Sequence, residues 1–127
     1  MAKLLIVDDE QDVRDFAANF FRKRNIDTDT ASSGEEAIEK VKISLPDLVL
    51  LDIRMQGMTG IQALEAIKKI HSAIKVIMVT GTRPDENEAY KKCLELGASG
   101  YLHKPLQLDE LEKVVLSMLK APANSST

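Results

Sequence analysis

Apolar residues gather in short runs along the chain, and each run is bounded by polar residues. Residues 4–7 and 48–51 are apolar throughout, the pattern of strands that are buried on both faces of a parallel sheet. The run at Ile26, Thr28 and Thr30 merely alternates with charged residues, as in an edge strand. These patterns predict five strands, at residues 3–8, 27–30, 47–52, 75–80 and 100–103.

Between these runs, hydrophobic residues recur every three or four positions, which is the spacing of an amphipathic helix. The first such helix has its inward face at Val13, Phe16, Ala17, Phe20 and Phe21. A second helix is predicted to open at a capping box from Ser33 to Glu36 and to stop at Pro46. Three more are predicted near residues 61–70, 85–96 and 108–119, with Gly97 in a left-handed conformation after the fourth.

Strands that alternate with helices predict an open α/β sheet with helices on both faces, a (βα)₅ arrangement. The length of 127 residues fits one domain, so residues 1–120 are predicted to form it. Residues 121–127 are small and polar, and they are predicted to be a flexible tail or the start of a linker.

Composition narrows the classes of function. There are 17 basic and 20 acidic residues, with no basic cluster, so direct nucleic-acid binding by this domain is not expected. No apolar run is long enough to span a bilayer or to form a signal peptide, so we expect a cytoplasmic protein without a membrane partner. Cys93 lies in an apolar helical pattern and is predicted to be a core residue rather than a nucleophile.

Polar residues stand at the carboxyl ends of four predicted strands. Asp8 and Asp9 follow the first, Asp52 ends the third, Thr80 ends the fourth, and Lys104 follows the fifth. Because the carboxyl ends of parallel strands form the ligand-binding edge of an open sheet, we expect these side chains to converge. Three clustered carboxylates repel one another and lose solvation, which calls for a cation, and an all-oxygen site of this kind suits Mg²⁺.

Each residue has an ordinary structural explanation when it is taken alone. Asp8 and Asp9 could cap the first helix, and Asp52 could be a turn residue after a strand. Five polar residues with matching roles at strand ends would then have to coincide. A shared site is therefore the better interpretation of the set.

The chain resembles the receiver domains of two-component response regulators, from Lys3 to about Leu119. Four motifs carry the resemblance: residues 7–10 (VDDE), 50–60 (LLDIRMQGMTG), 79–81 (VTG) and 97–105 (GASGYLHKP). Each motif is weak alone, but their order and spacing together are highly specific. The resemblance implies a flavodoxin-like sheet with strand order 2-1-3-4-5, which we carry over from the family.

The resemblance also implies the roles of the acidic residues. Asp52 would be the phosphoacceptor, and Asp9, Asp52 and the backbone carbonyl of Arg54 would bind Mg²⁺, with Asp8 reaching the ion through water. An aspartate can accept a phosphoryl group covalently, while Mg²⁺ and an ammonium neutralise charge on the phosphoryl oxygens. The phosphoryl group would come from a histidine kinase or a histidine phosphotransfer protein. Such a chain is a signalling switch that autophosphorylates and autodephosphorylates, and not a metabolic enzyme.

The remaining implied roles concern the signal. Thr80 and Lys104 would contact phosphoryl oxygens, the peptide bond from Lys104 to Pro105 would be cis, and Thr80 and Tyr101 would form the switch. Phosphorylation would then alter the face formed by the fourth helix, fifth strand and fifth helix. That face would control a downstream protein or an effector domain, and it is a candidate surface for a phosphorylation-dependent homodimer.

Two positions depart from the family pattern, and two others set an expectation for signal lifetime. Gln56 replaces the usual proline and Thr59 a common acidic residue, so we expect a more mobile loop after Asp52. Arg54 and Thr82 match positions that flank the path of the attacking water in the family. Because arginine cannot accept a proton from that water, we expect slow autodephosphorylation.

Three other classes of protein fit less well. A haloacid dehalogenase-type phosphatase needs an acid two residues after its nucleophile, where this chain has Arg54. A flavodoxin-like cofactor carrier needs a phosphate-binding loop after the first strand, where residues 8–10 would repel a phosphate. A receiver that acts only as a constitutive interaction module does not need the full acidic set.

Overall fold

Strands and helices alternate along the part of the chain that the structure describes. The computed structural model describes residues 2–81 and 87–120, with the backbone only at 87–90 and 120. The strands are β1 (Lys3–Val7), β2 (Asp27–Ala31), β3 (Leu48–Asp52), β4 (Lys75–Thr80) and β5 (Gly100–His103). The helices are α1 (Gln11–Arg22), α2 (Gly34–Ser44), α3 (Gly60–Ile70), α4 (Asn87–Glu95) and α5 (Leu108–Lys120). The predicted tail at 121–127 lies outside the described residues.

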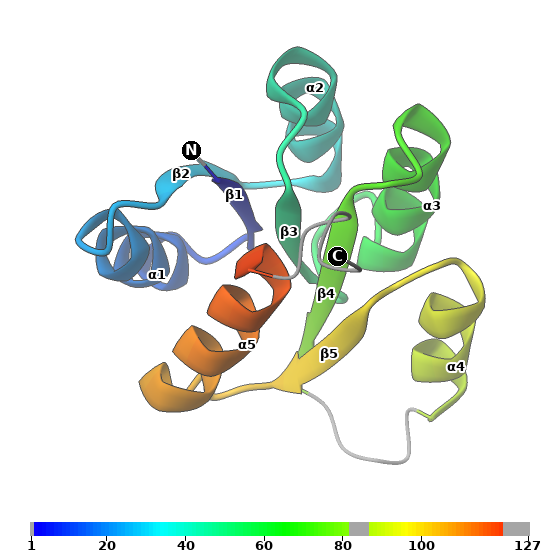
Figure 1. Ribbon diagram of the computed structural model, residues 1–127. Coiled ribbons are helices and arrows are strands. Elements are labelled where there is room, and N and C mark those ends of the chain that lie inside the picture. The colour runs from blue at the N-terminus through cyan, green and yellow to red at the C-terminus, as the bar shows by residue number, and fades with distance from the viewer. Residues whose placement is uncertain (1, 82–86, 121–127) are drawn as a thin grey trace.

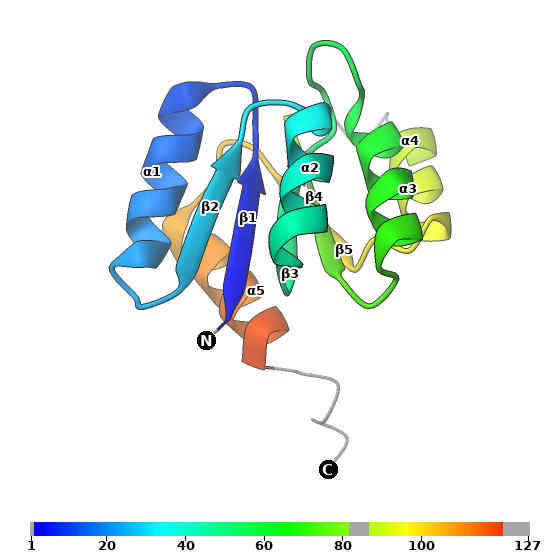
Figure 2. The same cartoon turned by 90° about the horizontal axis from the view of Figure 1, so that it is seen from above.

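The strands form one parallel sheet in the order β2-β1-β3-β4-β5. Helices α1 and α5 cover one face, and α2, α3 and α4 cover the other (Figures 1 and 2). The predicted strand order and the edge position of the second strand are both confirmed. The described helices run to 13 residues at most, and none of them is long and apolar enough to cross a membrane.

Alternating residues of the strands pack into two separate hydrophobic cores, one on each face of the sheet. Leu4 and Ile6 of β1 join the core under α1 and α5, whereas Leu5 and Val7 join the core under α2 and α3. All four side chains are at most 3% exposed, so both faces of the strand are buried, as the continuous apolar run predicts. Cys93 of α4 is fully buried in the second of these cores, which confirms its prediction as a core residue.

The ends of two helices correct and extend the sequence-based prediction. The Ser33 hydroxyl accepts a hydrogen bond from the Glu36 N–H, but the predicted reciprocal bond is wrong. The Glu36 carboxylate instead accepts bonds from both the N–H and the hydroxyl of Ser32, which offers two donors where Ser33 would offer one. Helices α2 and α4 each end at a residue in the left-handed conformation. Leu45 after α2 has φ 46°, and Gly97 after α4 has the predicted positive φ of 102°.

Phe16 is the clearest exception to the predicted burial. The helical spacing places it on the inward face of α1, yet its side chain is 51% exposed, while Ala17 and Phe21 are buried completely. The apolar stripe of α1 is wider than the surface that the sheet and α5 cover. Phe16 therefore lies at the edge of the covered surface, and it borders an open groove beside Pro105 and Leu106.

Candidate functional site

Four strand ends meet at one edge of the sheet and bring the predicted residues together. Val7 of β1 pairs with Leu51 of β3, so the next residues, Asp8 and Asp52, are neighbours. The Lys104 N–H donates to the Thr80 carbonyl at 2.7 Å, which fixes the chain after β5 beside the end of β4. The convergence expected from a parallel sheet is thus present in the structure.

The three carboxylates form a compact acidic cluster. One oxygen from each of Asp8, Asp9 and Asp52 lies within 4.8 Å of the other two. Asp8 and Asp52 are each 3% exposed, whereas Asp9 is exposed to solvent. Carboxylate oxygens that are close together and poorly solvated need a compensating cation, and a small hard ion such as Mg²⁺ matches this donor set. The residues present therefore fit the metal that the sequence predicts.

The side-chain ammonium of Lys104 supplies positive charge to the acidic cluster. Its Nζ lies 3.0 Å from Asp8 Oδ2, 3.1 Å from Asp52 Oδ2 and 3.6 Å from Glu10 Oε1. Burial works to lower the pKa of Lys104, but the hydrogen bonds to Asp8 and Asp52 outweigh it and raise the pKa above its usual value. The ammonium therefore stays charged across the physiological pH range.

The Asp52 carboxyl group is held by two donors. Lys104 Nζ binds Oδ2, and the Arg54 N–H donates to Oδ1 at 3.1 Å. Burial raises the pKa of Asp52 above its usual value, and the repulsion from Asp8 adds to this, while the bond from Lys104 offsets only part of the rise. Ionisation of Asp52 in the folded chain therefore costs stability.

Asp8 is fixed by groups that sequence reasoning did not assign. Its Oδ1 accepts a hydrogen bond from the Glu10 N–H at 2.9 Å, and its backbone carbonyl accepts one from Arg14 Nη1 at 2.8 Å. With Lys104 on Oδ2, both carboxylate oxygens of Asp8 are engaged, whereas the Asp9 carboxylate faces solvent. No sequence motif identified Arg14, although a basic residue near the start of the helix that follows the acidic pair is a signal that could have found it.

The remaining predicted site residues are placed as follows. Thr80 is 4% exposed at the end of β4, and the Lys104–Pro105 peptide bond is cis. Tyr101 is half-buried on β5, with its ring 5.0 Å from that of His103. Arg54 is exposed on the loop after β3, and Thr82 lies outside the described residues.

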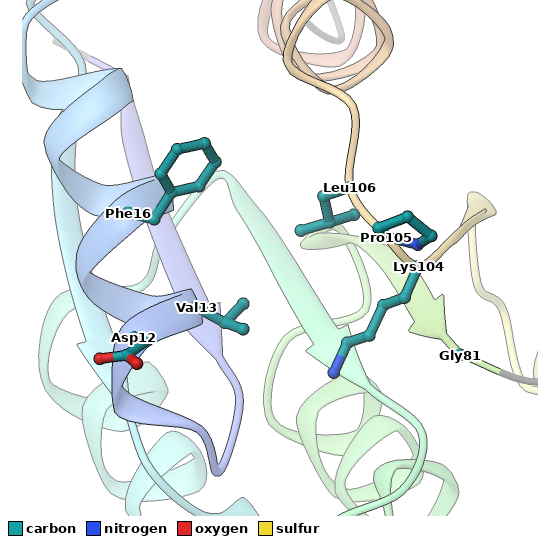
Figure 3. Close-up of a pocket in the computed structure, with 7 residues that line it drawn as sticks. All are labelled: Asp12, Val13, Phe16, Gly81, Lys104, Pro105 and Leu106. Carbon is teal, nitrogen blue, oxygen red and sulfur yellow. The ribbon is translucent and has the colours of Figure 1, made fainter.

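An apolar groove of about 690 Å³ opens beside Lys104, between α1 and the chain that leads into α5. Figure 3 shows Val13 and Phe16 on the α1 side and Pro105 and Leu106 facing them. The exposed Phe16 ring is therefore part of a lined depression that adjoins the acidic cluster through Lys104.

Comparison with known proteins identifies the family. The sequence profile described as "Response regulator receiver domain" matches residues 4–116. This chain belongs to the response regulator receiver domains. The fold agrees, because a CheY-like receiver structure from Methanospirillum hungatei superposes with a TM-score of 0.86 at 29% identity, covering 93% of this chain and 94% of that one.

Relatives of this receiver domain differ in length. Sporulation initiation phosphotransferase F of Bacillus subtilis is 36% identical over 122 residues, covering 96% of this chain and 97% of that protein. Chemotaxis protein CheY of Halobacterium salinarum is 34% identical, covering 95% and 100%. Regulatory protein AtoC of Escherichia coli is 36% identical, covering 93% of this chain, but the chain spans only 25% of its length.

The raised pKa of Asp52 predicts that Asp52→Asn stabilises the metal-free protein at neutral pH. Because the folded-state pKa lies above the unfolded value, the contribution of this group to stability is complete below an unfolded pKa of about 3.9 and is lost as pH rises through the folded-state pKa. The Tm of Asp52→Asn should exceed that of the parent at pH 7.5 in a chelator, and the gain should shrink towards pH 4.

Circular dichroism melts at both pH values test this expectation. Asp15→Asn, at an exposed position of α1, is the control and should leave Tm unchanged. An Asp52→Asn Tm at or below that of the parent at pH 7.5 would contradict the assigned cost of the buried charge.

Proposed function

We propose that this receiver domain takes a phosphoryl group on Asp52 in the presence of Mg²⁺. The observation that supports this most is the meeting of Lys104 with the Asp8, Asp9 and Asp52 carboxylates at one edge of the sheet. A charged nucleophile and a fixed cation within hydrogen-bond distance are what phosphoryl transfer requires, since catalysis of this reaction is mainly positioning and charge neutralisation.

The reaction follows from the placement of the side chains. A carboxylate oxygen of Asp52 forms a bond to phosphorus while the bond from phosphorus to the donor's leaving nitrogen or oxygen breaks, and the leaving group departs with the electron pair. The product is an aspartyl phosphate. Before transfer, the Lys104 ammonium is bonded to Asp8 and Asp52. After transfer, it would turn to one phosphoryl oxygen, and the Thr80 hydroxyl would donate to another.

Asp9, Asp52 and the Arg54 carbonyl would hold Mg²⁺ directly, and Asp8 would hold it through water. When bound, the ion neutralises charge on the phosphoryl oxygens. The engagement of both Asp8 oxygens by Lys104 and the Glu10 N–H favours this division, because Asp9 is the carboxylate that faces solvent. Asp8 then orders the site and Asp9 supplies a direct ligand.

The donor would be a histidine kinase or a histidine phosphotransfer protein, and it would dock on the apolar groove beside Lys104. Phe16 and Leu106 offer apolar surface on either side of a depression that ends at the proposed site. A donor helix with an apolar side chain in this groove would bring its phosphohistidine towards Asp52. Exposed aromatic residues in such depressions often dominate binding energy.

The output would come from the α4-β5-α5 face. The Thr80 hydroxyl moves when it binds the phosphoryl group, and Tyr101 follows on the neighbouring strand. A partner protein, an effector domain or a second copy that prefers the altered face would then bind. Arg54 and Thr82 would set how long this lasts, with the exposed Arg54 side chain lying over the phosphoryl group and excluding water.

Incubation with phosphoramidate and Mg²⁺ is expected to add one phosphoryl group to the chain. Intact-mass spectrometry should show the addition in the parent, and should show none in Asp52→Asn or after chelation of Mg²⁺. Asp15→Asn removes a carboxylate from the same domain and should be modified normally. A phosphoryl adduct that persists in Asp52→Asn would place the acceptor elsewhere.

Phe16→Ala is expected to slow transfer from a phosphohistidine-bearing protein by about tenfold in kcat/KM, because it removes an apolar anchor worth ~1.4 kcal/mol. Phosphorylation by phosphoramidate should be unchanged, since that donor does not need the groove. Leu94→Ala, at a similarly exposed leucine of α4, is the control and should transfer normally. Equal slowing with both donors would rule out a docking role for the groove.

The NMR amide shifts that accompany phosphorylation should concentrate in α4, β5 and α5. Thr80→Ser keeps the hydroxyl and should keep these shifts, whereas Thr80→Ala should lose most of them while Asp52 is still phosphorylated. An unaltered shift pattern in Thr80→Ala, or shifts confined to α1 and α2, would show that the signal takes another route.

Arg54→Asn together with Thr82→Glu is expected to lose its phosphoryl group about tenfold faster than the parent, equal to ~1.4 kcal/mol of barrier. An amide and a carboxylate can orient the attacking water, which arginine cannot. Decay of the phosphorylated mass after donor removal measures the rate, with Gln56→Ala of the same loop as the control. Slower loss in the double variant would mean that Arg54 assists hydrolysis as a transition-state cation.

A further inference from the structure

The loop between β3 and α3, residues 53–59, carries the Arg54 carbonyl of the proposed Mg²⁺ site, so this inference rests on the proposed function. Its near end is anchored in the core, because Ile53 and Met55 are 8% and 9% exposed. After Met55, the loop turns at Gly57, whose φ of 79° is a conformation in which a side chain would be strained. At the far end of the loop, Met58 packs partly against the same core, and one more anchor lies at the helix start.

That anchor is a reciprocal capping box at the start of α3. The Thr59 hydroxyl accepts a hydrogen bond from the Gln62 N–H at 3.2 Å, and the Gln62 side chain accepts one from the Thr59 N–H at 2.9 Å. Such a box satisfies two backbone donors at once and fixes where the helix begins. The helix start is in turn joined to the phosphoacceptor strand.

Gly60 makes the joint between the helix start and the site. Its N–H donates to the Ile53 carbonyl at 2.8 Å. A Cβ on Gly60 would lie 2.2 Å from the Asp52 carbonyl oxygen and 2.6 Å from Ile53 Cα, so the two backbones are in direct contact. A shift in the first turn of α3 would therefore reach Asp52 and, through the bond from the Arg54 N–H to Asp52 Oδ1, the loop that supplies the metal ligand.

We propose that Thr59, held by Gln62, is a positioning residue for the Mg²⁺ site. The Arg54 carbonyl is a neutral dipole, so its attraction for an ion falls off faster with distance than that of a carboxylate. It contributes to binding only when it is already in place, and loss of such outer supports commonly weakens metal sites.

The test is a Mg²⁺ titration of the metal-free protein, followed by NMR amide shifts to obtain Kd. Thr59→Val keeps the shape of the side chain but removes the acceptor, and it should raise Kd by about three- to tenfold. Gln62→Ala should raise Kd in the same direction, and the double variant should be less than additive, because both residues act through one box. Thr59→Ser restores the acceptor and should bind as the parent does.

Ile67→Val is the matched control for stability. It lies in the buried face of the same helix, so it should lower Tm by a similar amount while leaving Kd unchanged. Without metal, the Gly60 amide should exchange its hydrogen faster in Thr59→Val than in Ile67→Val, because the bond to Ile53 opens more often. A Thr59→Val Kd equal to that of the parent, or an equal rise in Ile67→Val, would overturn the proposal.

Asp9→Ala separates this proposal from the proposed metal site. Strong loss of Mg²⁺ affinity in Asp9→Ala together with a parent-like Kd in Thr59→Val would sink the positioning role alone. Affinity that is the same in the parent and in Asp9→Ala would show that the ion binds elsewhere, and the positioning role would fall with the site.

Discussion

Charge balance at the carboxyl ends of the strands is the constraint on which the site depends. Asp8 and Asp52 are buried within reach of each other, and the Lys104 ammonium is the side-chain cation that bonds both of them. One ammonium against three carboxylates leaves a net negative pocket, and burial, together with repulsion from Asp8, raises the pKa of Asp52. A divalent cation would offset this excess of negative charge.

The fold divides the site into fixed and accessible parts. Asp8 is held at its backbone by Arg14 and at its carboxylate by Glu10, and the Asp52 backbone lies against Gly60. The exposed residues Asp9 and Arg54, and the groove at Phe16, surround this fixed centre. Rigid strands therefore position the Asp52 carboxylate, while the loops present the exposed surfaces around it.

The capping of α3 shows why a departure from a family pattern has to be judged in three dimensions. From the sequence, Gln56 in place of proline and Thr59 in place of an acidic residue together predict a more mobile loop after Asp52. In the structure, Thr59 and Gln62 form the reciprocal box that the sequence pattern assigned to Ser33 and Glu36. Both pairs have the required spacing. At the start of α2, however, the N–H and the hydroxyl of Ser32 occupy the Glu36 carboxylate, so the bond back to Ser33 does not form.

The sequence by itself determined the strands of the sheet and the residues that stand at their carboxyl ends. It did so most directly for β1 and β3, because burial on both faces leaves a continuous apolar run that local pattern reveals. Family resemblance supplied the strand order. Only the tertiary structure decided that Phe16 borders a groove, that Arg14 binds the Asp8 carbonyl and that Lys104 bridges Asp8 and Asp52. Periodicity tells which face of a helix is apolar, but the partner that covers that face, or bonds across it, comes from a distant part of the chain.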